Sequence, residues 1–158
     1  MNIQPMLEMQ KKLNENLSIN LELDSYKLRT RKNLEFEINL GALANETACF
    51  NYLLDDTKNI DIDNIFTKYI NCISQVLTLG IDHNYTDINE ISMRPNDYCL
   101  SDQFLTLYID INDLIASPSI DHYQTLFEDL LSLGLTLGFT EEKIQNGFPK
   151  ILDTLVVV

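Results

Sequence analysis

The sequence predicts an all-α protein, a bundle of five to six helices that forms a single domain over residues 1–158. In several segments the apolar residues recur every three or four positions, which is typical of amphipathic helices. No segment shows a convincing strand alternation or a hairpin turn. Capping residues, glycine or proline separate the periodic segments. With 158 residues, of which 45% are hydrophobic, the chain can bury about two thirds of its unfolded surface.

Two helices are expected in the first third of the chain. Pro5 suits the first turn of a helix that should run to about residue 17. Asp24 or Ser25 can cap a second helix, which the pattern extends over residues 26–54. The apolar stripe of this second helix is expected to contain Leu34, Ile38, Leu40, Leu43, Ala44 and Phe50.

The middle of the chain predicts a third and a fourth helix. Asp61 or Asp63 can cap a helix over residues 64–83, whose apolar side is rich in isoleucine and leucine. A long irregular connection containing Pro95 follows. Ser101 is expected to cap the fourth helix, which ends near residue 116.

Two further helices are expected towards the C-terminus. Ser119 can cap the first of them, and Gly138 is expected to end it. Thr140 can cap the last helix, which Pro149 should end or kink. The segment "LDTLVVV" has the propensity of a strand but no partner strand, so its structure stays open.

The formal charge of −13 restricts the partners of this protein. Direct binding to nucleic acid is not expected, because no basic stripe is present to neutralise phosphates. Charged residues interrupt every apolar run before it could span a membrane, and the start of the chain does not resemble a signal peptide. We therefore expect a cytoplasmic protein without membrane contact. Its acidic surface would attract a basic protein partner.

Four segments, in order, carry a resemblance to a known family. They are "MLEMQKKLNENL", "LGALANETACFNYL", "TKYINCISQVLTLGIDHNY" and "LFEDLLSLGLTLGFTEEKIQNGF". In these segments the chain resembles the dimeric all-α dUTPases, which are relatives of the MazG-type nucleotide pyrophosphatases. The resemblance implies an all-α dimeric fold and a pyrophosphatase ancestry.

The resemblance also locates a metal site that this chain no longer supports. The family places two carboxylates three residues apart on one helix and two more on the next helix, and this spacing puts each pair on one helical face. The matching positions here are Asn39, Ala42, Lys68 and Asn71, and none of them is a carboxylate. Because Mg²⁺ needs oxygen ligands and negative charge, we expect that it is lost, with no catalytic residue and no cofactor remaining.

Other residues could still contact a nucleotide. The resemblance assigns recognition of a pyrimidine to Gln10 and Asn14, and it makes Asn45, Phe50 and Lys68 further candidate nucleotide-binding residues. The Lys-Asn phosphate contacts of the family are absent near the C-terminus, where this chain reads "GFPKILDTLVVV". The acids that could form a displaced metal site are Glu35, Glu37, Glu46 and Asp63.

These features give three hypotheses about function. The first is a catalytically inactive dUTPase-like protein, of a kind that phages encode, which captures a basic protein such as a DNA-binding repressor. The second is a metal-free nucleotide-binding protein in which Lys68 offers its ammonium group to phosphate. The third is an active dUTP or dCTP pyrophosphatase with a remodelled site. A homodimer is expected in each case, formed through the helix that bears Phe50 and Tyr52 and through the third and fourth helices.

Overall fold

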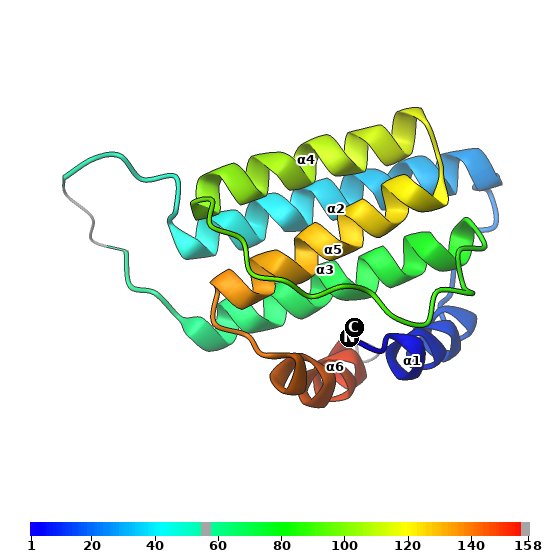
Figure 1. Cartoon of the computed structure of the whole chain (residues 1–158). Helices are drawn as coiled ribbons and strands as arrows, with labels where there is room; N and C mark the ends of the chain where they lie inside the picture. Colours follow the sequence, from blue (N-terminus) through cyan, green and yellow to red (C-terminus); the bar gives the residue numbers. More distant parts are fainter. Residues whose placement is uncertain (55–57, 156–158) are drawn as a thin grey trace.

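The computed structural model describes residues 1–54 and 58–155, and it confirms the all-α fold (Figure 1). Within these residues the only strand-like pairing is an isolated bridge between Asn2 and Glu90. The six helices are α1 (Gln4–Glu15), α2 (Ser25–Thr47), α3 (Ile62–Asp82), α4 (Leu100–Ala116), α5 (Ile120–Thr136) and α6 (Glu141–Leu155).

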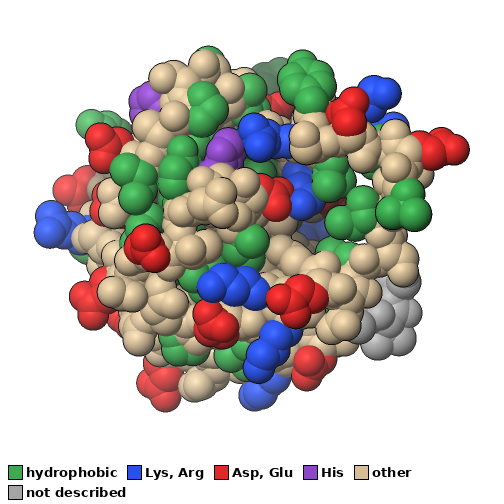
Figure 2. All heavy atoms as spheres, turned by 90° about the vertical axis from the view of Figure 1, so that its right-hand side faces the viewer, with side chains coloured by type: hydrophobic (Ala, Val, Ile, Leu, Met, Phe, Trp, Pro, Cys, Tyr) green, Lys and Arg blue, Asp and Glu red, His purple; other side chains and the backbone are tan. Residues whose placement is uncertain are grey.

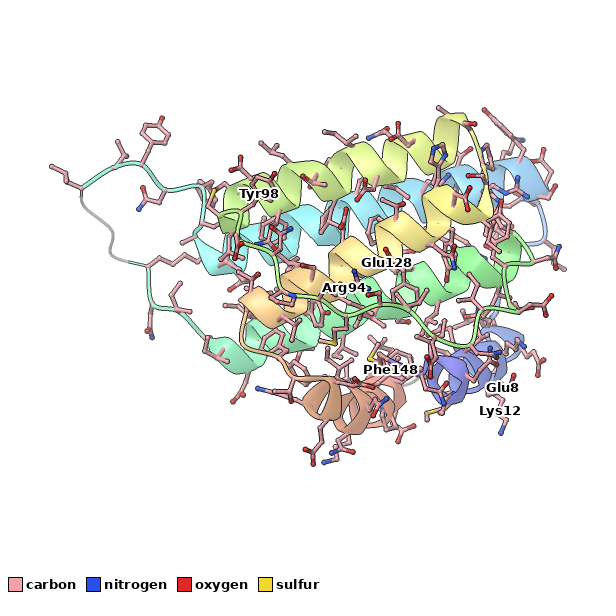
Figure 3. The ribbon with its side chains drawn as sticks, in the orientation of Figure 1. Glu8, Lys12, Arg94, Tyr98, Glu128 and Phe148 are labelled. Carbon is pink, nitrogen blue, oxygen red and sulfur yellow. The ribbon has the colours of Figure 1, made fainter. Side chains whose placement is uncertain are left out.

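Helix α3 is the centre of the bundle, because it packs against α1, α2, α5 and α6. The most extensive contacts are those within two antiparallel pairs, α2 with α3 and α4 with α5 (Figure 1). Helices α1 and α6 lie side by side below these pairs. Phe148 is fully buried and lies on the side of α6 that faces the bundle (Figure 3). Each helix therefore covers its apolar side by contact with α3 or with a neighbour of α3.

The two helical pairs share a local sequence pattern that the periodicity analysis missed. The segments "YINCISQVLTLG" in α3 and "YQTLFEDLLSLG" in α5 both begin with a buried tyrosine and end with a glycine at the same spacing. Both glycine carbonyls accept a hydrogen bond of 2.8 Å from the backbone five residues on, in one case from Tyr85 and in the other from Phe139. The ends of α3 and α5 thus have the same construction.

Several predicted helix boundaries are confirmed by the caps. The Asp24 carboxylate accepts a 2.8 Å hydrogen bond from the Lys27 amide at the start of α2. Asp61, rather than Asp63, caps α3. Ser119 caps α5, and Gly138 follows that helix with a φ of 88°, a conformation that glycine adopts without a steric penalty.

The prediction for the second helix was wrong at its end and for part of its stripe. Helix α2 ends at Thr47, because Ala48 takes a left-handed conformation with a φ of 53°. Phe50 therefore lies in the following loop and is 59% exposed. Leu34 and Ile38 are 56% and 61% exposed, whereas the buried residues of α2 are Phe36, Leu40 and Leu43. Leu40 and Leu43 of the predicted stripe are thus buried as expected, and packing against α3 buries Phe36 with them in place of Leu34 and Ile38.

Two further boundaries differ from the predictions. The Ser101 hydroxyl donates to the Cys49 carbonyl instead of capping α4, and Cys99 takes the N-cap position. Pro149 does not end the last helix, since α6 continues to Leu155. A proline inside a helix costs about 3 kcal/mol. Burial of Phe148 and Leu152 on either side of it holds both halves of α6 against the core. Residues 152–155 are thus helical, and residues 156–158 lie outside the described part of the chain.

The long connection between α3 and α4 runs across the bundle and fixes the start of the chain. The side-chain amide of Gln4 donates to the Ile88 carbonyl at 2.8 Å, and the terminal amino group donates to Ile91 at 2.7 Å. Further along this connection, Arg94 and Tyr98 line an open hollow together with Glu128 of α5 (Figure 3).

The distribution of charged side chains on the surface agrees with the acidic composition of the chain. On the face shown in Figure 2, the Lys and Arg side chains are interspersed with Asp and Glu and form no continuous basic area. None of the described helices is long and apolar enough to cross a membrane.

Candidate functional site

A pocket of about 250 Å³ lies between α1, α2 and α3. Five of its lining side chains are carboxamides, and two more carry hydroxyl groups. The polar lining comprises Gln10, Asn14, Asn39, Asn71, Gln75, Ser74 and Thr78, with Lys32 and Glu35. Leu13, Leu17, Ile19 and Leu155 supply apolar surface. The pocket is therefore mostly neutral and rich in groups that both donate and accept hydrogen bonds.

One wall of the pocket is a hydrogen-bonded network between α1 and α3. The buried Gln10 accepts a 2.7 Å hydrogen bond from the Ser74 hydroxyl and donates at 2.9 Å to Asn14. The Asn14 amide in turn donates to the Thr78 hydroxyl at 3.3 Å. Gln10 and Asn14 are four residues apart, and so are Ser74 and Thr78, so each pair shares one helical face. This network fixes the orientation of both side chains that the resemblance assigns to pyrimidine recognition.

The pocket also brings together two of the four positions that correspond to the metal site of the family. Asn39 of α2 and Asn71 of α3 line the same pocket, which the packing of α2 on α3 predicts. Ala42 and Lys68 lie one turn further along the same helices and are not part of the lining. No hydrogen bond or ion pair of the Lys68 ammonium is found within residues 1–54 and 58–155. The Lys68 side chain could reach solvent, pair with an acid such as Glu35, Glu46 or Asp63, or contact a ligand phosphate, and the pairing is not found among the described residues.

The remaining candidate residues lie away from the pocket. Asn45 is exposed on the last turn of α2, where its carbonyl oxygen accepts a hydrogen bond from the Lys58 ammonium. Phe50 lies in the loop after α2. Sequence reasoning missed Ser74, Gln75 and Thr78. Their signal was present, because they are polar residues at helical spacing from Asn71 on a helix that is otherwise strongly apolar.

The charges at the pocket compensate one another in part. The Lys32 ammonium pairs with the Asp82 carboxylate at 2.8 Å, and both side chains are mostly buried. Glu35 is the only carboxylate among the lining residues that the structure describes. Nearby on α3, burial raises the pKa of the Cys72 thiol to about 12, even though Lys68 lowers it. The Cys72 thiol is therefore neutral and unreactive at physiological pH.

The pocket does not fit the magnesium ion that the resemblance implies. Mg²⁺ prefers octahedral oxygen ligands with negative charge, and it gives up its water reluctantly. The former ligand positions in the pocket offer only the neutral oxygens of Asn39 and Asn71. Among the described residues, no group of three or more His, Cys, Asp or Glu side chains could hold a metal ion. Of the acids considered for a displaced site, only Glu35 lines the pocket, whereas Glu37, Glu46 and Asp63 do not.

The fold and the pocket define an all-α helical-bundle protein with a polar pocket between its first three helices. The family model described as dUTPase matches residues 2–151 of the chain. The chain therefore belongs to the all-α dUTPase family, as the four sequence segments indicated. Comparisons with curated proteins and with solved structures gave no significant match.

Proposed function

We propose that this dUTPase-family protein has lost metal-dependent hydrolysis and acts by binding. The observation that supports this proposal is the presence of Asn39 and Asn71 in the pocket at positions where the family has metal carboxylates. Neutral amide oxygens leave the charge of Mg²⁺ uncompensated. Lys68, one turn away on α3, adds a positive charge at a third ligand position and opposes cation binding further.

The direct test is hydrolysis of dUTP and dCTP by the full chain with Mg²⁺ and with Mn²⁺. We expect no release of pyrophosphate above background. Gln10→Ala and Asn71→Ala serve as matched controls, because a contaminating enzyme would give the same trace rate in both variants and in the wild type. Turnover that EDTA abolishes and that these variants reduce would overturn the proposal and would favour a remodelled pyrophosphatase.

The first candidate for the binding activity is capture of a basic protein, such as a DNA-binding repressor. It is supported by apolar side chains that the bundle leaves in solvent on two helices that pack together, α2 and α4. They include Leu34 and Ile38 on α2, with Leu105 and Ile109, which are 62% and 60% exposed, on α4. Exposed apolar residues next to a strongly acidic surface suit a partner with basic residues around an apolar centre.

Variants of the exposed apolar residues on α2 and α4 test the capture of such a partner. A purified basic repressor from the native host should bind the wild type and should bind Ile38→Lys/Ile109→Lys at least about tenfold more weakly. Ile60→Lys is the matched control, because Ile60 is 43% exposed but lies outside α2 and α4. Binding should also weaken with salt, since the attraction between opposite charges is screened. Equal binding by both variants would exclude this surface.

The second candidate is binding of a small ligand in the carboxamide pocket without a metal ion. The hydrogen-bonded pair of Gln10 and Asn14 supports it, because these two side chains are held in place before any ligand arrives. Lys68 does not line the pocket, which argues against the specific hypothesis that it binds the ligand phosphate.

A further inference from the structure

A second hollow lies between the connection that precedes α4 and the exposed side of α5. Figure 3 shows that Arg94 and Tyr98 belong to the connection and Glu128 to α5. The hollow has a volume of about 710 Å³, within the roughly 300–1,000 Å³ of small-molecule sites. It shares no lining residue with the pocket between α1, α2 and α3, so the two are separate sites.

The groups that line this hollow are held in place by the fold. At one end of the loop wall, the Ile91 carbonyl accepts a 2.7 Å hydrogen bond from the terminal amino group. At the other end, the Tyr98 carbonyl accepts a 2.7 Å hydrogen bond from the side-chain amide of Gln103 in α4. The other wall is helix α5, where Glu128 and Ser132 are four residues apart and share one helical face. Walls that are ordered in advance lower the cost of binding a ligand.

Two opposite charges line the hollow without pairing with each other. Neither the Arg94 guanidinium nor the Glu128 carboxylate forms an ion pair or a hydrogen bond within residues 1–54 and 58–155. A guanidinium group binds a carboxylate through two parallel hydrogen bonds, and a carboxylate binds an ammonium or guanidinium group in the same way. A ligand that carries both a carboxylate and a cation therefore satisfies both residues at once.

The other charges favour a ligand with more positive than negative groups. Among the described lining residues, the three carboxylates of Asp97, Glu128 and Asp129 stand against one guanidinium group, which gives a formal charge of −2. A hydrogen bond with the buried Asp110 holds the Asp129 carboxyl group in place. A ligand with two cationic groups and one carboxylate complements this arrangement.

Two further side chains offer contacts to such a ligand. Ser132 is 7% exposed and lines the hollow, and its hydroxyl group has no hydrogen-bond partner within the described residues. Hydroxyl groups of buried residues are usually paired, so this one marks a place for a ligand atom. Tyr98 is 71% exposed, and its ring can bind a guanidinium or ammonium group over its face.

We propose that this hollow binds a free basic amino acid, L-arginine or L-lysine. The α-carboxylate of the ligand pairs with Arg94, and its two cationic groups pair with Glu128 and Asp129. The Ser132 hydroxyl supplies a further hydrogen bond. This inference goes beyond the proposed function and does not depend on it, because the hollow contains none of the former metal positions.

The test is calorimetry on the full chain with L-arginine, L-citrulline, agmatine and Nα-acetyl-L-arginine. We expect L-arginine to bind. Each of the other three should bind at least about tenfold more weakly, because it lacks the side-chain cation, the carboxylate or the α-ammonium group, respectively. Absence of binding by both L-arginine and L-lysine would overturn the inference. Equal binding of L-citrulline or of Nα-acetyl-L-arginine would overturn it as well, since the charges would then not select the ligand.

Variants at the two unpaired charges provide a second readout. Arg94→Gln should weaken L-arginine by about tenfold but should not weaken agmatine, which has no carboxylate. Glu128→Gln should weaken both compounds. Arg31→Gln and Glu15→Gln are the matched controls, because both residues are exposed and lie outside the hollow. All four residues are on the surface, so the Tm of the free protein should not change.

The two charged residues can thus be tested one at a time. If Arg94→Gln binds L-arginine like the wild type, or weakens L-arginine and agmatine to the same extent, Arg94 does not hold the carboxylate and the inference fails. If Glu128→Gln binds L-arginine like the wild type, the cationic end of the ligand is not where the inference places it, and the inference fails in that case too.

Discussion

Tyr69 and Tyr123 form a reciprocal contact between the central helix α3 and helix α5. The Tyr69 hydroxyl donates to the Leu130 carbonyl of α5 at 3.0 Å, and the Tyr123 hydroxyl donates to the Val76 carbonyl of α3 at 3.1 Å. Each ring also packs against a glycine of the other helix, Tyr69 against Gly134 and Tyr123 against Gly80. Burial raises the pKa of both hydroxyls, so both remain protonated donors at physiological pH.

The first prediction concerns the space that Gly134 leaves for Tyr69. A β-carbon at residue 134 would overlap the Tyr69 hydroxyl, so Gly134→Ala should destabilise the protein by about 1–3 kcal/mol despite the better helix propensity of alanine. Urea denaturation gives the free energy of unfolding. In a Tyr69→Leu background the same change should cost much less, because the ring is gone. Strictly additive effects of the two changes would contradict this contact.

The second prediction concerns a carboxyl group buried between α4 and α5. Asp110 is 7% exposed, and its Oδ2 receives no hydrogen bond from a donor within the described residues. Burial, a hydrogen bond between the Asp110 and Asp129 carboxyl groups, and the charges of Asp129 and Asp113 raise the pKa of Asp110 to about 8. The folded protein therefore keeps this proton from about pH 4 to pH 8, whereas the unfolded chain loses it near pH 4. The free energy of unfolding should fall as the pH rises through this window.

Asp110→Asn should remove this pH dependence, because the amide cannot ionise. Its stability relative to the wild type should increase from about pH 4 and level off above about pH 8. Urea denaturation across this range measures the difference. Asp153→Asn is the control, since Asp153 is exposed on α6, is not among the groups that raise the pKa of Asp110, and should leave the slope nearly unchanged. A wild type whose stability does not change between pH 5 and pH 8 would show that Asp110 is ionised in the folded state.

The third prediction concerns restoration of the metal site. The variant Asn39→Glu/Ala42→Glu/Lys68→Glu/Asn71→Asp should bind Mn²⁺ in calorimetry, and the wild type should not, because only the variant has carboxylates to compensate the cation. Metal binding should return before turnover, since the Lys-Asn phosphate contacts of the family are absent as well. A variant with glutamates at exposed α2 positions, Thr30→Glu/Leu34→Glu, controls for added charge. Equal Mn²⁺ binding by the two variants would contradict the assignment of the site.

The fourth prediction concerns self-association. A homodimer should give a light-scattering mass near twice the 18.2 kDa of the chain at micromolar concentration. The surface that we expect to be covered is the one suggested by the sequence, around Phe50 and Tyr52, which are 59% and 90% exposed. The exposed apolar residues of α2 and α4 then stay open to the basic partner. Phe50→Lys/Tyr52→Lys should give a mass near that of one chain, whereas Ile120→Lys, at a 44% exposed residue of α5, should not change it. A wild-type mass near 18.2 kDa would argue against the dimer.

Local signals in the sequence determined most of the secondary structure. Asp24, Asp61 and Ser119 cap the helices that they were expected to cap, because an N-cap needs only its own side chain and the next three amides. The apolar periodicity identified the helices because it, too, depends only on residues that are close together in the sequence. Three of the four family segments likewise lie within one helix and its adjoining turn, and the fourth spans α5, the turn after it and the first half of α6. The family match confirms the all-α dUTPase family that they indicated.

Tertiary structure decided what depends on neighbours distant in the sequence. Leu34 and Ile38 follow the same helical period as Phe36 and Leu40, and only packing against α3 shows which residues of α2 are buried. The sequence placed Lys68 beside Asn71, but the contacts of α1, α2 and α3 left Lys68 outside the pocket and admitted Gln75. The spacing of residues along one helix shows which of them share a face of that helix. Which of those residues line a pocket depends on how the side chains of three separate helices meet.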